Sequence, residues 1–258
     1  MREKPSPSGV VSIRAYAELN DFLPRYRRQR DFSCPLNGGH SLKHIVESAG
    51  IPHTEIELIL VNGRSVDFSH TVQAGDRISV YPVFESIDVT PILALRPEPL
   101  RRTGFVLDVH LGKLALILRL LGFDVKFPGN ISDEELAEIS ANEHRILLTR
   151  DTMLLKRNRV THGCYLHSQF PEEQAVGILD RLDIRNSARP FTRCLNCGGY
   201  LEPVSKESIM ERLEPLTRKY YNEFSICSDC GKIYWKGSHF KPLIELLERL
   251  GIHDWEES

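Results

Sequence analysis

Apolar and polar positions divide the chain into three stretches, and the first predicts a small α+β unit. Residues 10–16 alternate between the two classes, as a half-buried strand does. Ser41 and Gly50 are placed to begin and end a short helix, and Asn62-Gly63 follows a β-rich run as a strong hairpin signal. The expected elements are strands at 10–16, 57–61 and 77–81 and a helix at 41–50.

The second stretch alternates between β and α patterns. Ser132 and Glu135 form a capping-box sequence at the start of one helix, and Gly122 ends the helix before it. Alternation of this kind predicts a parallel sheet with helices on both faces. The expected strands are 103–108, 123–127, 145–149 and 165–167, and the expected helices are 110–121, 132–142 and one that begins near Pro171.

The third stretch contains two cysteine pairs, few long apolar runs and a closing amphipathic helix at 242–250. A linker is expected before the second stretch, because prolines, which fix φ and remove a donor, recur there. We therefore expect a small domain at 1–88, a linker at 89–102, an α/β domain at 103–186, and a cysteine-rich segment with a final helix at 187–258.

The composition narrows the class of protein. With 41% hydrophobic and 26% charged residues among 258, the chain is expected to be globular rather than disordered, collagenous or a coiled coil. The longest apolar run, Leu114–Leu118, is far shorter than the about 20 residues that cross a bilayer. Residues 1–5 do not lead into the apolar core of a secretory signal. We therefore expect a cytosolic protein with no membrane span.

The net charge is −2, and basic and acidic residues are nearly balanced in every stretch, so affinity for nucleic acid would have to come from a local patch. A helix N-terminus together with Lys113 could bind a phosphate. The alternative for each basic cluster of the chain is a solvated surface with no ligand. The basic clusters are Arg25, Arg27, Arg28 and Arg30; His110 and Lys113; and Arg150, Lys156, Arg157 and Arg159.

Three acidic residues of the second stretch lie where an expected strand ends or an expected helix begins. Asp108 ends the first expected strand, Asp133 opens a helix, and Asp151 follows the third strand. Open α/β sheets place ligand sites at the carboxyl ends of their strands, and converging carboxylates attract Mg²⁺ or Mn²⁺. The alternative is that Asp133 and Asp151 only stabilise helix N-termini.

Four of the six cysteines form Cys194-x-x-Cys197 and Cys227-x-x-Cys230, with 29 residues between the pairs. Four thiolates complete a tetrahedron around Zn²⁺, which predicts a structural rather than catalytic zinc; a redox pair is the alternative. Residues 232–239 then interleave aromatic and basic side chains, among which Lys236 could hold a phosphate. Trp235 either stacks on bases or packs the cysteine-rich segment onto the α/β domain.

The first stretch resembles the ubiquitin-like β-grasp fold of small sulfur carriers. The resemblance rests on Leu58–Gly63 and Ala74–Phe84. In those carriers the chemistry lies on a free C-terminal Gly-Gly, whereas here Phe84 continues into Glu85-Ser-Ile-Asp. We therefore expect an interaction or stabilising module, with a possible protein partner, rather than a carrier.

The second and third stretches resemble the Mut-seven C-terminal RNase family of PIN-like nucleases over about residues 103–245. The motifs are Asp108–Ala115, Leu120–Asp124, Ser132–Glu135 and Leu148–Asp151. The resemblance implies a metal-dependent ribonuclease that uses Asp108, Asp133 and Asp151. Leu116 and Ile117 depart from the family, in which Arg and Trp are frequent there, so one RNA contact is in doubt.

These resemblances imply an α/β, PIN-like parallel sheet with flanking helices, an N-terminal α+β β-grasp domain and a C-terminal zinc ribbon. The leading hypothesis is hydrolysis of RNA phosphodiester bonds with one or two Mg²⁺ or Mn²⁺ ions, aided by His110, Lys113, Arg150 and Lys236. A non-catalytic RNA- or ribosome-binding zinc-ribbon module and a partner-binding structural protein are the alternatives. The RNA substrate, endo- or exonuclease action and the oligomeric state are left open by the sequence.

Overall fold

The computed structural model describes residues 9–36, 41–82 and 104–253, and these fall into two compact units. The first unit joins the N-terminal part of the chain to Ser140–Tyr165. The second unit comprises Arg102–Ile139 and Leu166–Ser258. The expected linker at 89–102 lies outside the described residues, and the expected domain boundaries stay predictions.

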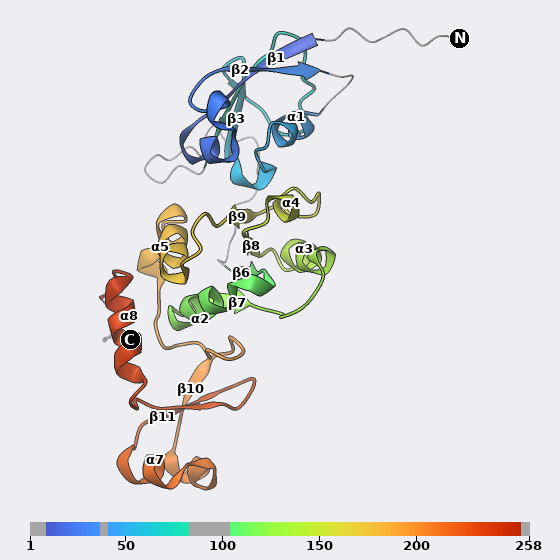
Figure 1. The fold of residues 1–258 in the computed structure, drawn as a ribbon. Helices are drawn as coiled ribbons and strands as arrows, with labels where there is room; N and C mark the ends of the chain where they lie inside the picture. Colours follow the sequence, from blue (N-terminus) through green and yellow to red (C-terminus); the bar gives the residue numbers. More distant parts are fainter. Residues whose placement is uncertain (1–8, 37–40, 83–103, 254–258) are drawn as a thin grey trace. The chain divides into compact units, whose positions relative to one another are not determined.

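The N-terminal part of the first unit is a mixed five-stranded sheet in the order β2-β1-β5-β3-β4, with a helix against one face (Figure 1). β1 and β5 are parallel at its centre, and the other pairs are antiparallel. This β-grasp-like arrangement confirms the expected α+β unit. Its elements are β1 Gly9–Ala15, β2 Phe32–Leu36, α1 Leu42–Ser48, β3 Leu58–Val61, β4 Arg64–Ser65 and β5 Arg77–Tyr81.

Local sequence signals explain these elements. Alternation along β1 buries Val11, Ile13 and Ala15 in the core of this sheet. The Ser41 side chain accepts a hydrogen bond from the N–H of His44 and so caps α1. Asn62 and Gly63, at φ 51° and 82°, form the turn between β3 and β4, which requires left-handed backbone at both positions.

The expected parallel sheet is present, with the order β7-β6-β8-β9. β6 runs parallel to β7, and β8 runs parallel to β9. The strands are β6 Gly104–Leu107, β7 Asp124–Lys126, β8 Ile146–Thr149 and β9 Gly163–Tyr165. The helices are α2 Gly112–Leu120, α3 Asp133–Asn142, α4 Thr152–Leu155 and α5 Pro171–Arg181.

Two details differ from expectation. β9 begins two residues before the expected 165–167, at Gly163, where a Cβ would lie 2.5 Å from a side-chain carbon of Leu155. The helix expected from residue 110 starts as a 3₁₀ turn, Val109–Leu111, before α2. Most of α2 is buried, but Leu116 is 47% exposed.

The first unit also contains contacts between the β-grasp sheet and the segment around β9. The N–H of Tyr165 donates to Oε1 of Glu55 at 2.5 Å, and Nε2 of His53 lies 2.8 Å from the carbonyl oxygen of Val160. Both His53 and Glu55 are buried, in a 3₁₀ turn, η3 (His53–Glu55). The β-grasp domain therefore supplies a hydrogen-bond acceptor to β9 and a contact to the segment before it, which supports a stabilising role.

The C-terminal part of the second unit is a small antiparallel sheet in the order β10-β11-β12. Its own core cluster has only three buried side chains, Ile209, Leu213 and Phe224. Little apolar burial is therefore available to hold this segment together. The elements are β10 Leu201–Val204, α6 Lys206–Ile209, α7 Pro215–Tyr220, β11 Phe224–Cys227, β12 Ile233–Tyr234 and α8 Phe240–Arg249.

Candidate active site and metal centre

Asp108 directly follows β6 and is the N-terminal cap of the 3₁₀ turn that leads into α2. Its Oδ1 accepts a hydrogen bond from the N–H of His110 at 3.4 Å, and the side chain is half-buried. β6 is buried along its whole length, so the chain first reaches solvent at this aspartate. Asp108 therefore lies at the carboxyl end of a core strand, where α/β proteins place ligand sites.

Asp133 is the first residue of α3 and is exposed. The expected capping box is present beside it: the Ser132 hydroxyl accepts from the N–H of Glu135, and Glu135 accepts from the N–H of Ser132. The hydrogen bonds from the Ser132 backbone and side chain lower the pKa of Glu135. Because Ser132 and Glu135 cap the helix, Asp133 is not needed for that purpose.

Asp151 lies two residues beyond β8 and is exposed. Its Oδ1 accepts from the N–H of Met153 at 2.7 Å, so it caps α4, as the simpler sequence interpretation anticipated. The N–H of Asp151 donates to the Thr149 hydroxyl at 3.0 Å. These two hydrogen bonds fix the backbone and one carboxylate oxygen of Asp151 at the carboxyl end of a buried strand.

Three of the four basic residues expected to contact substrate lie near these acids along the chain. His110 and Lys113 are exposed on the turn and first helical residues after Asp108. Arg150 is exposed between β8 and Asp151. Lys236, in the cysteine-rich segment, pairs with Glu223 at 3.6 Å, and its ammonium also lies 5.9 Å from the Phe240 ring centroid.

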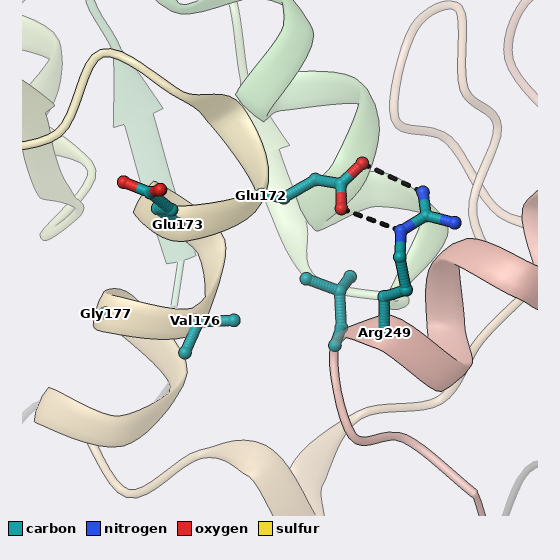
Figure 2. Close-up of a pocket in the computed structure, with 6 residues that line it drawn as sticks. Glu172, Glu173, Val176, Gly177 and Arg249 are labelled. Carbon is teal, nitrogen blue, oxygen red and sulfur yellow. Dashed lines mark hydrogen bonds and ion pairs between the residues drawn. The ribbon is translucent and has the colours of Figure 1, made fainter.

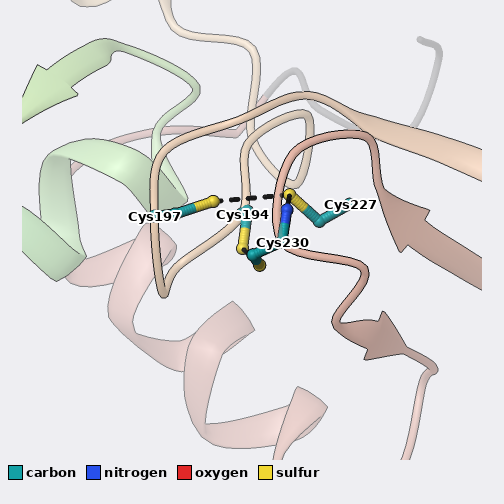
Figure 3. Close-up of side chains that lie close together, drawn as sticks. All are labelled: Cys194, Cys197, Cys227 and Cys230. Atoms are coloured by element: carbon teal, nitrogen blue, oxygen red, sulfur yellow. Dashed lines mark hydrogen bonds between the residues drawn. The ribbon is translucent and has the colours of Figure 1, made fainter.

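The four paired cysteines converge, as Figure 3 shows, and their sulfur atoms all lie within 4.8 Å of one another. Sγ of Cys197 is 3.4 Å from Sγ of Cys227, and Sγ of Cys194 is 3.6 Å from Sγ of Cys230. A tetrahedron with zinc–sulfur bonds of about 2.3 Å has edges of about 3.8 Å, whereas a disulfide needs about 2.05 Å. The cluster thus fits a four-thiolate structural zinc site, with no position left for substrate.

The hydroxyl of Tyr234 lies 3.1 Å from Sγ of Cys194. Burial acts to raise the pKa of Cys194, but hydrogen bonds from Tyr234 and from nearby backbone N–H groups outweigh it and lower this pKa to about 6. Burial, with the neighbouring thiols adding to it, raises the pKa of Cys197 to about 12. The two pKa values move in opposite directions because one thiolate disfavours a second beside it, and a divalent cation bound by all four sulfurs would remove that penalty.

The chain matches the family described as the Mut7-C RNAse domain over residues 103–247. The chain belongs to the Mut7-C RNase domain family. Residues 8–88 match a second family, described as Mut7-C ubiquitin, in agreement with the β-grasp-like sheet. No curated protein and no solved structure gave a match. Across the described residues, no helix combines the length and the apolar character needed to cross a membrane.

The most informative residue that the sequence interpretation missed in this Mut7-C domain is Arg119. It is 4% exposed on α2, and its guanidinium donates to the carbonyl oxygens of Val125, Leu195 and Asn196. Burial lowers the pKa of Arg119, while the sulfurs of Cys197 and Cys194 act to raise it. The signal was a single arginine within the apolar run Leu114–Leu121, which is typical of a buried cation with dedicated partners.

A surface pocket of the Mut7-C domain lies between α5 and α8 (Figure 2). Glu172 on α5 accepts two hydrogen bonds of 2.9 Å from Arg249 on α8, and this pair lines the pocket. Val176, Gly177 and Leu250 contribute the apolar part of the lining. Since the charged groups satisfy one another, the pocket is best explained as the junction of two helices rather than a substrate site.

Proposed function

We propose that this protein is a divalent-metal-dependent ribonuclease that hydrolyses RNA phosphodiester bonds, with Asp108, Asp133 and Asp151 as its metal ligands. The observation that carries the proposal is the match of residues 103–247 to the Mut7-C RNAse domain. It is supported by the positions of Asp108 and Asp151, each at the carboxyl end of a buried strand. β6 and β8, which precede them, are neighbours in the strand order.

The chemistry of the three acids suits hard cations. Carboxylate oxygens are preferred ligands of Mg²⁺ and Mn²⁺. A bound Mg²⁺ or Mn²⁺ ion would supply an activated water and stabilise the charge that develops on the phosphate. Three acids are compatible with one ion or with two, and both arrangements belong to the proposal.

The protein's own contribution is to position these groups. The hydrogen bond from Met153 orients the carboxylate of Asp151, and the one from His110 does the same for Asp108. His110, Lys113 and Arg150 would bind backbone phosphates of the RNA, because each is exposed and lies no more than five residues from a proposed ligand. Lys236 would contact the RNA from the cysteine-rich segment.

The zinc proposed for the four cysteines has a structural role, because four protein ligands complete its coordination. Thiolate ligands require reduced cysteines, which favours the cytosol as the compartment. A protein partner bound through the β-grasp domain is a further part of the hypothesis, whereas a membrane is not.

Asp151→Asn is the sharpest test, because asparagine caps a helix about as well as aspartate but brings no negative charge. We expect the variant to keep the stability of the parent and to lose Mn²⁺-dependent cleavage of RNA by on the order of a hundredfold or more. Glu202→Gln, which removes an exposed charge from β10, is the control and should cleave as the parent does.

The rival function is RNA binding without catalysis. One observation favours it: Asp108 and Asp151 each cap a helical turn, which accounts for both acids without a metal. If the parent binds RNA but releases no cleavage product in Mg²⁺ or Mn²⁺, the rival stands and the nuclease proposal is wrong. If Asp151→Asn cleaves as fast as the parent, the assignment of Asp151 as a metal ligand is wrong.

A further inference from the structure

The basic run of the first stretch is not used by the proposed nuclease site. It lies in a surface loop of the β-grasp domain, residues 24–30, which we call the arginine loop. The loop contains a 3₁₀ turn, η2 (Arg25–Arg27), and follows another, η1 (Ala17–Phe22). Four of its seven residues are arginines.

Buried and partly buried hydrogen bonds hold the arginine loop in a defined shape. The side chain of Asn20, which is 7% exposed, donates to the carbonyl oxygens of Ala15 and Ala17 and accepts from the N–H of Gln29 at 2.6 Å. Nε of Arg28 donates to the carbonyl oxygen of Leu23 at 2.8 Å. The two ends of the loop are therefore tied together, which lowers the entropy that the loop would lose on binding a ligand.

The acidic residues nearby are paired with arginines other than the most exposed ones. Asp21 pairs with Arg28 at 3.6 Å, and Asp31 pairs with Arg14 at 3.7 Å. Among the residues that the structure describes, no carboxylate pairs with Arg25, Arg27 or Arg30. The loop consequently presents surplus positive charge to solvent.

An aromatic platform accompanies this charge. The Tyr26 ring is 68% exposed to solvent. The Arg27 guanidinium lies 5.5 Å from the Tyr26 ring centroid and 4.9 Å from that of Phe32. Stacked arginine and tyrosine side chains offer flat surfaces to nucleobases, while the neighbouring arginines can hold phosphates.

The arginine loop is also fixed to the segment that carries Asp151. The Phe22 ring, just before the loop, meets the Tyr165 ring edge-to-face at a centroid distance of 5.4 Å. Tyr165 ends β9, the strand paired with β8, and β8 leads into Arg150 and Asp151. These elements belong to the same compact unit.

We propose that the arginine loop is a binding surface for single-stranded RNA, with Arg25 and Arg30 on phosphates and Tyr26 and Arg27 stacked on bases. This inference rests on the proposed function, since it assigns part of the RNA substrate to the β-grasp domain. Single-stranded RNA is favoured over an acidic peptide because the loop combines charge with exposed stacking surface, and only nucleic acid uses both.

The experiment measures binding separately from cleavage. Fluorescence anisotropy follows a short labelled oligouridylate bound to full-length, zinc-loaded Asp151→Asn protein over a series of KCl concentrations. Arg25→Ala/Arg30→Ala is compared with Arg64→Ala/Arg77→Ala, which removes the same charge from β4 and β5 of the same domain. Tyr26→Ala tests the stacking contribution at unchanged charge.

We expect Arg25→Ala/Arg30→Ala to weaken binding on the order of tenfold and to reduce the salt slope by about 1.4, since each phosphate contact contributes about 0.7 for single strands. Tyr26→Ala should weaken binding by about fivefold or more. Equal losses in the two double-arginine variants, or no loss in either, would overturn the proposal. Competition by polyglutamate as effective as competition by unlabelled RNA would assign the loop to acidic peptides instead.

Cleavage by the proteins that retain Asp151 separates this inference from the proposed function. A parent that cuts no RNA, alongside loop-dependent binding, refutes the nuclease and leaves the binding surface standing. A parent that cuts RNA, with Arg25→Ala/Arg30→Ala equal to it in both binding and cleavage, refutes the binding surface and leaves the nuclease standing.

Discussion

Nη1 of Arg119 donates a hydrogen bond of 2.8 Å to the carbonyl oxygen of Asn196. Asn196 lies between the two cysteines of the first pair, so a buried cation on α2 contacts the backbone that surrounds the proposed zinc. The same guanidinium contacts Val125 in β7. Arg119 therefore joins β7 and the cysteine cluster within the second unit, and its positive charge interacts with the sulfurs of Cys194 and Cys197.

Arg119→Met should destabilise the protein by on the order of 3 kcal/mol, because it leaves buried carbonyl oxygens without donors. Arg119→Lys should restore little, since one ammonium cannot reproduce the forked contacts. Urea denaturation of the zinc-loaded protein measures the change, and Lys113→Ala, at an exposed position of the same helix, is the control. An Arg119→Met variant as stable as the parent would show that these carbonyl oxygens find other partners.

Tyr234→Phe removes the hydroxyl that lies 3.1 Å from Sγ of Cys194 while keeping the ring. Groups that hydrogen-bond to metal ligands typically change metal affinity by about 10- to 100-fold, and we expect zinc binding to weaken within that range. Competition with a chromophoric chelator measures the affinity. Tyr220→Phe, at an exposed tyrosine of α7, should have no effect; a similar loss in both variants would contradict the assigned contact.

Removal of zinc should unfold the cysteine-rich segment and leave the β-grasp domain folded. The segment's own core cluster has three buried side chains, whereas the β-grasp core contains many more, so only the former depends on metal–thiolate bonds. Hydrogen exchange before and after chelation should show lost protection in β10 and β11 and retained protection in β1 and β5. Full protection of β10 and β11 in protein shown by mass spectrometry to be metal-free would refute this.

Glu55→Ala should destabilise the first unit by about 1–3 kcal/mol, because the N–H of Tyr165 loses its acceptor. Glu55→Gln keeps an acceptor oxygen and should cost less. Hydrogen exchange at Tyr165 should accelerate in the alanine variant, and Glu18→Ala in the same domain is the control. Unchanged exchange would mean that the β-grasp domain does not support β9 in solution.

The ion pair of Glu172 and Arg249 should make stability depend on pH in the acidic range. The hydrogen bond from Arg249 lowers the pKa of Glu172 below its ordinary value of 4.5. A carboxyl group whose pKa is lower in the folded state stabilises the protein at pH values above its ordinary pKa. This stabilisation is lost as the pH falls through the folded-state pKa. Between about pH 5 and pH 3, the urea midpoint of the parent should therefore fall more than that of Glu172→Gln. Parallel pH curves for the two proteins would contradict the pairing.

The elements that were predictable from sequence are those with strong local signals. Asn62-Gly63 forms its turn, and Ser132 with Glu135 forms its capping box, because the interactions involved span two or three residues. The strand Phe32–Leu36 was missed because Pro35 breaks the usual pattern. Proline is tolerated here since β2 is an edge strand of its sheet.

In the candidate site, too, residues with local sequence signals were predictable and residues with distant partners were not. The four cysteines were predictable because ligand spacing within each pair is a local signal, and their convergence is confirmed. The placement of Asp108 and Asp151 after strands is also confirmed, whereas their joint binding of a metal stays a prediction. Arg119 and Glu55 could not be assigned roles, since their partners lie 77 and 110 residues away.

The contacts of His53 and Glu55 have a consequence for the order of events during synthesis. Their partners, Val160 and Tyr165, are made 107 and 110 residues later. At ribosomal speeds of about 5–20 residues per second, the finished N-terminal domain waits on the order of 10 s before the strand it supports emerges. Synthesis therefore delivers Glu55 well before the strand to which it is hydrogen-bonded, so the N-terminal domain is already available when β9 pairs with β8.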